Sequence, residues 1–180
     1  FLRHFYPVLL YTGLYRETGS LNQMFYSGYL DPFFYRWDEH LFGFAPCFSF
    51  MAALPYRFVS EVFYLAYFSY YMMIFGVGLA LYLRQRTQFH HYISVTSFVF
   101  YVCYIVYIFL PVVGPRIYYP DLADLRLPAD AMPAMVPEFP AAVRAGCFYR
   151  IMAVIYDLFE SRGAAFPSSH VAIALVTVYF

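Results

Sequence analysis

The sequence predicts an all-α fold, a polytopic bundle of transmembrane helices with interfacial helices and a proline-rich extramembrane loop. Hydrophobic residues make up 63% of the chain and aromatic residues 24%, whereas only 12% of the residues are charged. An ordinary soluble domain has roughly a quarter of its residues charged and about half apolar. The apolar residues also gather in long uncharged runs, which is typical of helices that have lipid as their solvent.

Two uncharged runs are long enough to cross a membrane. The runs Val62 to Leu83 and Tyr92 to Leu110 carry no charged residue, and a helix needs about 20 apolar residues to cross the hydrocarbon. Pro111 ends the second run, because proline lacks an amide hydrogen and restricts the residue before it. We therefore predict transmembrane spans at about 60–83 and 92–110.

Shorter apolar segments at the two ends predict two further spans. Residues 1–15 and 169–180 are apolar and reach the first and last residues of the sequence. We expect both spans to continue beyond it, so that residues 1–180 form a single membrane domain truncated at both ends.

Two segments are predicted to lie at the membrane surface. The apolar segment 146–160 is too short to cross and carries Arg150 and Asp157, which favours an interfacial helix. Trp37 and the surrounding aromatic residues favour the same position for residues 31–55, because tryptophan is enriched at membrane–water interfaces.

The orientation is predicted from a short loop, residues 84–91, which carries two arginines next to two spans. Such loops prefer the cytoplasmic side, so residues 16–58 and 111–166 are expected on the opposite, non-cytoplasmic face. Residues 111–145 are rich in proline at irregular spacing, which indicates an ordered loop or lid. The formal net charge is zero, and this leaves no basic face for nucleic acid.

The most informative motif stands before the last apolar run. Pro167 suits the first turn of a helix, and Ser168 and Ser169 are good N-cap candidates. The free N–H groups of that turn and the positive end of the helix dipole would form an anion site. His170 lies in the same turn and could donate a proton to a phosphate ester oxygen. The alternative is a capped helix with an interfacial histidine that has no chemical role.

A second candidate is Arg116, which follows the second long span. A guanidinium matches a phosphate with two parallel hydrogen bonds, although arginines at helix ends also extend toward water without a specific ligand. If 146–160 does not cross the membrane, Arg116 and His170 emerge on one face and are free to converge. Tyr101, Tyr104 and Tyr107 recur along the span before Arg116, which favours helix packing, with a lipid groove as the alternative.

These residues carry a resemblance to a known family. Pro167-Ser168-Ser169-His170 is similar to the second motif, P-S-G-H, of the type 2 phosphatidic acid phosphatase superfamily, with Ser169 in place of glycine. The stretches 15–22, 30–34 and 41–46 resemble the branch that includes inositol phosphorylceramide synthases. The resemblance extends over most of the chain, and the second motif is its specific part.

The resemblance implies a lipid-phosphate phosphatase or phosphotransferase that works through a phosphohistidine. His170 would assist the leaving group, while Arg116, Ser168 and Ser169 would bind the phosphate. The resemblance implies no metal and no cofactor. The implied partners are the lipid bilayer and a phosphorylated lipid substrate, the protein would be an integral membrane protein, and its active site would face the non-cytoplasmic side.

The chain also departs from the family pattern. The first motif, K-x6-R-P, has Phe109 in place of lysine and Ile117 in place of proline. The third motif, S-R-x5-H-x3-D, which supplies the attacking histidine, is not matched, because Ser161-Arg162 leads to Ser168 and Ala172 where histidine and aspartate should stand. We therefore expect an N-terminal fragment that is inactive alone, with the nucleophile about 40 to 60 residues beyond His170, after two further spans.

Two other function classes stay open. Transport pathways place ionisable groups at mid-membrane, and the two long spans carry only Ser, Thr, Tyr and Cys among their polar residues, which disfavours a transporter. A non-catalytic membrane scaffold of the same fold remains the main alternative, because the first motif is degraded. The identity of the lipid and the oligomeric state do not follow from the sequence.

Overall fold

The computed structural model describes residues 2–25, 27–44, 46–118 and 140–180. All regular structure in these ranges is helical, which confirms the predicted all-α class for this part of the chain. Residues 119–139 of the predicted proline-rich loop lie outside the described residues. The helices are α1 (Leu2–Leu21), the 3-10 turn η1 (Asn22–Met24), α2 (Asp31–Phe42), α3 (Pro46–Ala53), α4 (Arg57–Arg84), α5 (Arg86–Phe109), α6 (Pro115–Tyr118), α7 (Ala141–Arg144), α8 (Cys147–Phe159) and α9 (Ser169–Tyr179).

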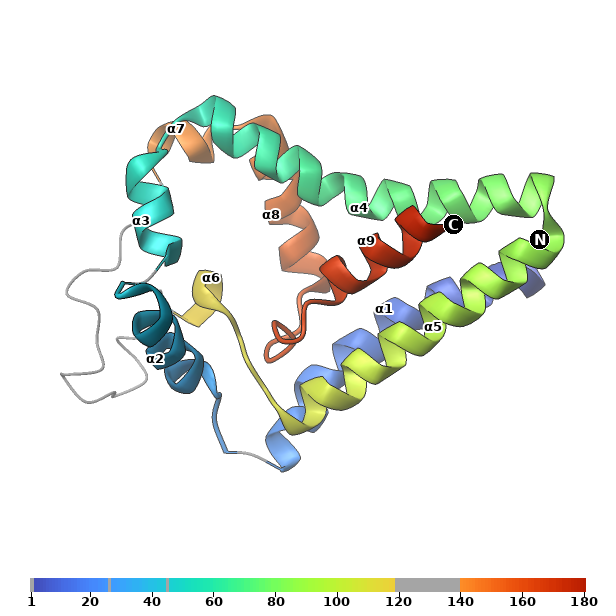
Figure 1. The fold of residues 1–180 in the computed structure, drawn as a ribbon, viewed down its shortest axis with the longest axis horizontal. Helices are drawn as coiled ribbons and strands as arrows, with labels where there is room; N and C mark the ends of the chain where they lie inside the picture. Colours follow the sequence, from blue (N-terminus) through green and yellow to red (C-terminus); the bar gives the residue numbers. More distant parts are fainter. Residues whose placement is uncertain (1, 26, 45, 119–139) are drawn as a thin grey trace.

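Helices α4 and α5 form a long hairpin whose two arms diverge in a V (Figure 1). The predicted loop 84–91 is wrong, because Gln85 is the single non-helical residue of the turn. The first turns of α5 are helical because Phe89 is completely buried, with its ring 5.2 Å from Tyr82 and 5.1 Å from Phe5, centroid to centroid. The free energy gained by burying this ring exceeds the preference of its polar neighbours for a loop.

Helix α1 runs alongside α5, and α9 lies between the two arms of the V (Figure 1). The Tyr104 hydroxyl donates to the Tyr11 carbonyl oxygen at 2.9 Å and so fastens α5 to α1. On α9, Ile173 is fully buried, and the hydroxyls of Thr177 and Tyr92 lie 3.3 Å apart. The core between these helices contains the buried residues Tyr11, Tyr70, Phe100, Cys103, Tyr104, Tyr107 and Ile173.

Helix α8, at residues predicted to be interfacial, is fixed to α4 by a carboxylate. The Glu61 carboxylate accepts hydrogen bonds from the backbone N–H groups of Cys147, Phe148 and Tyr149, at 2.8 to 3.1 Å. These are the first, otherwise unpaired donors of α8, and the positive end of the helix dipole favours the charge. A side chain at Gly146 would overlap Glu61, so glycine permits this approach.

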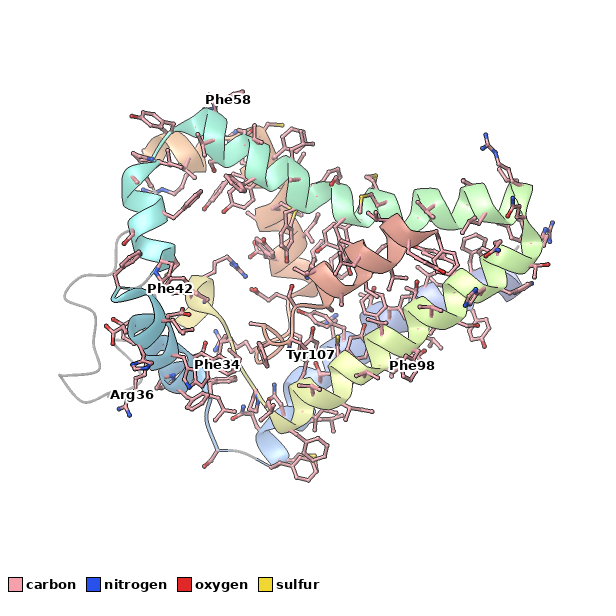
Figure 2. All side chains as sticks on the ribbon, viewed as in Figure 1. Phe34, Arg36, Phe42, Phe58, Phe98 and Tyr107 are labelled. Atoms are coloured by element: carbon pink, nitrogen blue, oxygen red, sulfur yellow. The ribbon has the colours of Figure 1, made fainter. Side chains whose placement is uncertain are left out.

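Helices α4 and α5 are long and apolar enough to cross a membrane. The protein buries only 11% of the most apolar window of α4 and 33% of that of α5. Large apolar side chains point away from the helices, among them Phe58 and Phe98, which are 79% and 68% exposed (Figure 2). Helices α2, α3 and α6 lie at the open end of the V (Figure 1).

Candidate active site

The segments that carry Arg116 and His170 are joined by a short stretch of backbone pairing. Val112 and Ala164 form a parallel β-bridge, in which the Val112 N–H donates to the Gly163 carbonyl oxygen at 3.2 Å and the Ala165 N–H donates to the Val112 carbonyl oxygen at 2.8 Å. The pairing is possible because Pro111 ends α5 and leaves the following residues extended. The loop after α5 and the loop before α9 therefore form one unit.

The end of α1 and the first residue of η1 contact this unit. The Asn22 side chain is fully buried and donates to the Arg162 carbonyl oxygen at 2.8 Å, and the hydroxyls of Thr18 and Ser161 lie 3.3 Å apart. Gly163 has a φ of 91°, a conformation that favours glycine. A side chain at Gly163 would overlap Asn22. Polar side chains at the end of α1 and the start of η1 thus contact the loop before α9.

The N-terminus of α9 is held by a serine and a tyrosine. Ser168 is the N-cap, and its hydroxyl accepts from the Val171 N–H at 3.3 Å. The Tyr107 hydroxyl donates to the Pro167 carbonyl oxygen at 2.9 Å and accepts from the Ser169 N–H at 3.3 Å. Tyr107 points from α5 toward α9 (Figure 2). Two of the N–H groups predicted to be free for an anion, those of Ser169 and Val171, are therefore already bonded.

His170 projects from the first turn of α9 into a group of tyrosine rings on α4. Its ring centroid lies 4.4 Å from that of Tyr70, 4.6 Å from that of Tyr67 and 6.2 Å from that of Tyr71. Aromatic contacts of this length fix the orientation of a ring. The imidazole is therefore held in one place relative to α4.

Arg116 lies in α6 against the end of α8. Its guanidinium forms a salt bridge with Glu160 and lies over the Tyr156 ring, 3.9 Å from the ring centroid. Burial raises the pKa of the Tyr156 phenol, and the positive charge of Arg116 opposes that rise. Arg116 is therefore positioned by a charge on one side and by an aromatic face on the other.

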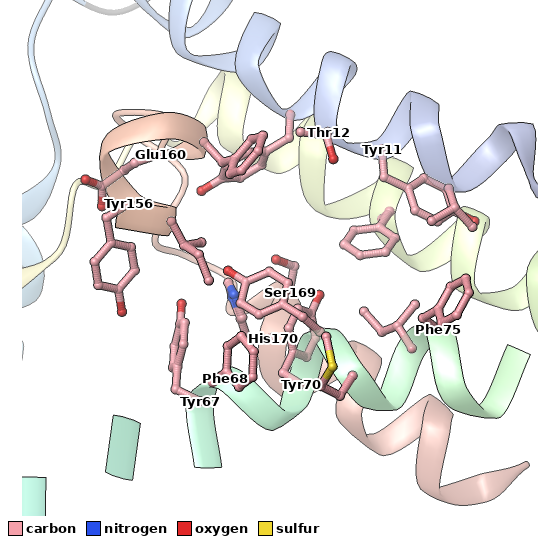
Figure 3. Close-up of a pocket in the computed structure, with 18 of the residues that line it drawn as sticks. Tyr11, Thr12, Tyr67, Phe68, Tyr70, Phe75, Tyr156, Glu160, Ser169 and His170 are labelled. Carbon is pink, nitrogen blue, oxygen red and sulfur yellow. The ribbon is translucent and has the colours of Figure 1, made fainter. Parts of the chain in front are cut away.

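A cavity of about 420 Å³ connects these elements. Figure 3 shows Tyr156 and Glu160 toward one end, Phe75 toward the other, and His170 with Ser169 between them. The lining residues are mostly aromatic or aliphatic and come from α1, α4, α5, α8 and α9: Val8, Tyr11, Thr12, Tyr15, Tyr67, Phe68, Tyr70, Tyr71, Met72, Ile74, Phe75, Phe100, Tyr104, Ile155, Tyr156, Phe159, Glu160, Ser169 and His170. The cavity is thus an apolar chamber with a charged end.

The structure places the four predicted site residues at different distances from this cavity. His170 and Ser169 line it, and Ser168 caps the same helix from an exposed position. Arg116 is outside the lining but contacts two residues of it, Tyr156 and Glu160. Tyr156 and Tyr67 stand between Arg116 and His170, as the ring contacts show.

Two residues of this arrangement were not predicted from the sequence. Tyr156 and Glu160 gave no signal, because their contacts with Arg116 depend on how α8 folds back on α4. Tyr107 did give a signal, since tyrosines recur every three residues along α5. Tyr104 lines the cavity and Tyr107 clamps α9, so packing and groove lining are both present on that helix.

Comparison with known proteins gives one family. A family model described as the PAP2 superfamily matches residues 33–180, which include α3 to α9, all of α2 except its first two residues, and the predicted site residues Arg116, Ser168, Ser169 and His170. No curated protein and no solved structure matches the chain.

Proposed function

This chain belongs to the PAP2 superfamily, and from that premise we propose that it acts as a phosphatase or phosphotransferase on a phosphorylated membrane lipid. Members of the superfamily are phosphatases and phosphotransferases. The observation that carries the proposal is the backbone pairing of Val112 with Ala164. It ties the loop that leads to Arg116 to the loop that leads to His170.

The cavity supports a lipid as the substrate class. From Tyr67 to Phe75 it follows α4 over nine residues, which corresponds to about 12 Å along the helix axis. A hydrocarbon chain in this part of the cavity would bury apolar surface against aromatic rings, which is favourable by about 25 cal/mol per Å². In this arrangement the phosphate of the same lipid lies toward His170 and Arg116.

The proposed roles follow from the chemistry of each side chain. His170 donates a proton to the leaving-group oxygen, a function worth roughly 10²- to 10⁴-fold in rate. Arg116 leaves Glu160 and pairs with the phosphate, since a doubly charged phosphate binds a guanidinium in the same bidentate way as a carboxylate. Ser168 and Ser169 place the positive end of the α9 dipole next to the phosphate. The attack on phosphorus is not assigned to any histidine of the 180 residues.

The proposal places the protein in a membrane. Helices that are apolar all round are stable either in a protein core or in lipid, and α4 and α5 are largely unburied. The turn between them carries Arg84 and Arg86, which favours the cytoplasmic side for that end. The site is then on the non-cytoplasmic face. Single cysteines at Gln88 and Ala142 should be labelled from opposite sides by an impermeant thiol reagent, and labelling from the same side would contradict this orientation.

The function is tested by measuring turnover with the full-length protein in vesicles. Vesicles that contain a diacyl lipid phosphate or a single-chain lipid phosphate are incubated with the protein, with a chelator present, and phosphate release and transfer to an alcohol are both measured. We expect turnover of at least one lipid phosphate with the chelator present. If the wild-type protein turns over none of them faster than His170→Ala does, the proposed function is wrong.

A further inference from the structure

We propose that Asp31 is a positioning residue for Arg116, which it holds through the turn at Val113 and Gly114. The inference rests on the proposed function, in which Arg116 binds the substrate phosphate. Asp31 is far from Arg116 in the sequence, and it belongs to none of the three catalytic motifs compared above.

The geometry of the contact is specific. The Asp31 side chain is buried, and its two carboxylate oxygens have separate partners. The Val113 N–H donates to Oδ2 at 2.9 Å, and the Gly114 N–H donates to Oδ1 at 2.7 Å. A third bond joins the same segments, because the Leu30 N–H donates to the Pro111 carbonyl oxygen at 2.9 Å.

Little freedom remains between this anchor and Arg116. Gly114 has a φ of 85°, in the left-handed region that favours glycine. Pro115 follows, and its ring fixes φ near −65°. Arg116 is the next residue, so its Cα is separated by a single rigid residue from a turn whose two N–H groups are bound to one carboxylate. Hydrogen bonds to a charged acceptor are roughly twice as strong as neutral ones.

A buried carboxylate is costly, which argues for a positional role. Burial raises the pKa of Asp31, and the hydrogen bonds from Val113 and Gly114 oppose that rise. An apolar side chain here would leave the Val113 and Gly114 N–H groups without their acceptor. The carboxylate therefore offsets its own burial cost through these two hydrogen bonds, and it fixes two adjacent backbone groups in one geometry.

Asp31 itself lies on α2, a helix whose exposed residues suit a membrane surface. Asp31 is the first residue of α2, and the same helix exposes Phe33, Trp37 and Leu41, which recur every four residues. On its inner side the Phe34 ring lies 4.8 Å from that of Phe166, next to the second motif. Through Asp31, the depth of Arg116 would be set by a helix that lies among the lipid headgroups.

The test is a double-mutant cycle in the full-length protein, with Asp31→Asn, Arg116→Ala and the combination of both. Asparagine has nearly the same shape as aspartate, but its NH₂ group is a donor. It would face the N–H of Val113 or of Gly114, and that hydrogen bond would be lost. We expect Asp31→Asn to raise KM for the lipid phosphate and the inhibition constant of inorganic phosphate by roughly 10- to 100-fold. In the Arg116→Ala background the same change should have little further effect, because both substitutions remove one function.

Asp38→Asn is the matched control, since it makes the same change on the same helix, and it should leave both constants unchanged. If Asp31→Asn does not fold, as judged by thermal melting, Asp31→Glu keeps the charge but displaces it and should show the same loss of phosphate binding. If the double variant shows the full sum of the free-energy effects of Asp31→Asn and Arg116→Ala on phosphate binding, the inference is wrong. Phosphate inhibition that is unchanged in Arg116→Ala would instead overturn the proposed role of Arg116, on which the inference rests.

Discussion

Val112 and Ala164 are paired by a parallel β-bridge, although more than 50 residues separate them in the chain. The pairing uses the N–H of Ala165, which donates to the Val112 carbonyl oxygen at 2.8 Å. The two segments that carry the candidate site residues are thus connected by backbone and not only by side chains.

Ala165→Pro removes this N–H donor, and we expect it to lower both stability and turnover. A lost hydrogen bond costs about 0.5–1.5 kcal/mol, which corresponds to a melting temperature lower by about 1–6 °C for a protein of this size. Turnover should fall by more than the loss of folded protein explains, because the segment before His170 is no longer aligned with the segment before Arg116. Ala165→Ser keeps the N–H and serves as the control. Equal turnover of the two variants would show that the bridge does not position the site.

Tyr107→Phe tests the clamp on the N-terminus of α9. The phenylalanine leaves the buried Ser169 N–H and the Pro167 carbonyl oxygen without their partner, which costs about 1–3 kcal/mol. We expect a lower melting temperature and a lower kcat. Tyr101→Phe, on the same helix, should change neither quantity by much. A Tyr107→Phe protein that melts and turns over like the wild type would exclude the clamp.

The two ends of the site differ in how far they could be predicted. The second motif and the helix that begins at Ser169 follow from local rules, because proline, serine and an apolar run act within one helical turn. Arg116 could be singled out by its charge at the end of a span. Asp31, Tyr156 and Glu160 could not, because their roles depend on which helices pack together. The error at 84–91 has the same origin, since the burial of Phe89 is a tertiary effect.

A pair of glycine substitutions tests the contact between α4 and α8. Gly146→Ala would push a side chain into the Glu61 carboxylate, and overpacking of this kind costs about 1–3 kcal/mol. Gly76→Ala meets nothing within 4 Å and should be neutral or stabilising by up to about 1 kcal/mol, because alanine favours a helix. The measurement is thermal unfolding in detergent. If Gly146→Ala is as stable as Gly76→Ala, Glu61 does not fix α8.

The cavity predicts that substrate preference depends on chain length. Val8 lines the cavity and Leu9 is exposed. Val8→Phe should fill part of the cavity and raise KM for a long-chain lipid phosphate roughly tenfold, which corresponds to the loss of about two buried methylene groups. KM for a short-chain analogue should change little. Leu9→Phe is the control. An equal effect of Val8→Phe on both substrates would contradict a chain in this cavity.

The central claim is that His170 acts on a lipid phosphate held at the charged end of the cavity. It is tested most directly by the rate of phosphate transfer from radiolabelled lipid phosphate, measured for the wild type, His170→Ala and His40→Ala in the full-length protein at equal expression. His40 is an exposed histidine on α2 and serves as the control. We predict that His170→Ala lowers kcat by roughly 10²- to 10⁴-fold and that His40→Ala retains the wild-type rate. A His170→Ala protein with the wild-type rate would contradict the account and leave His170 as a packed residue at a capped helix.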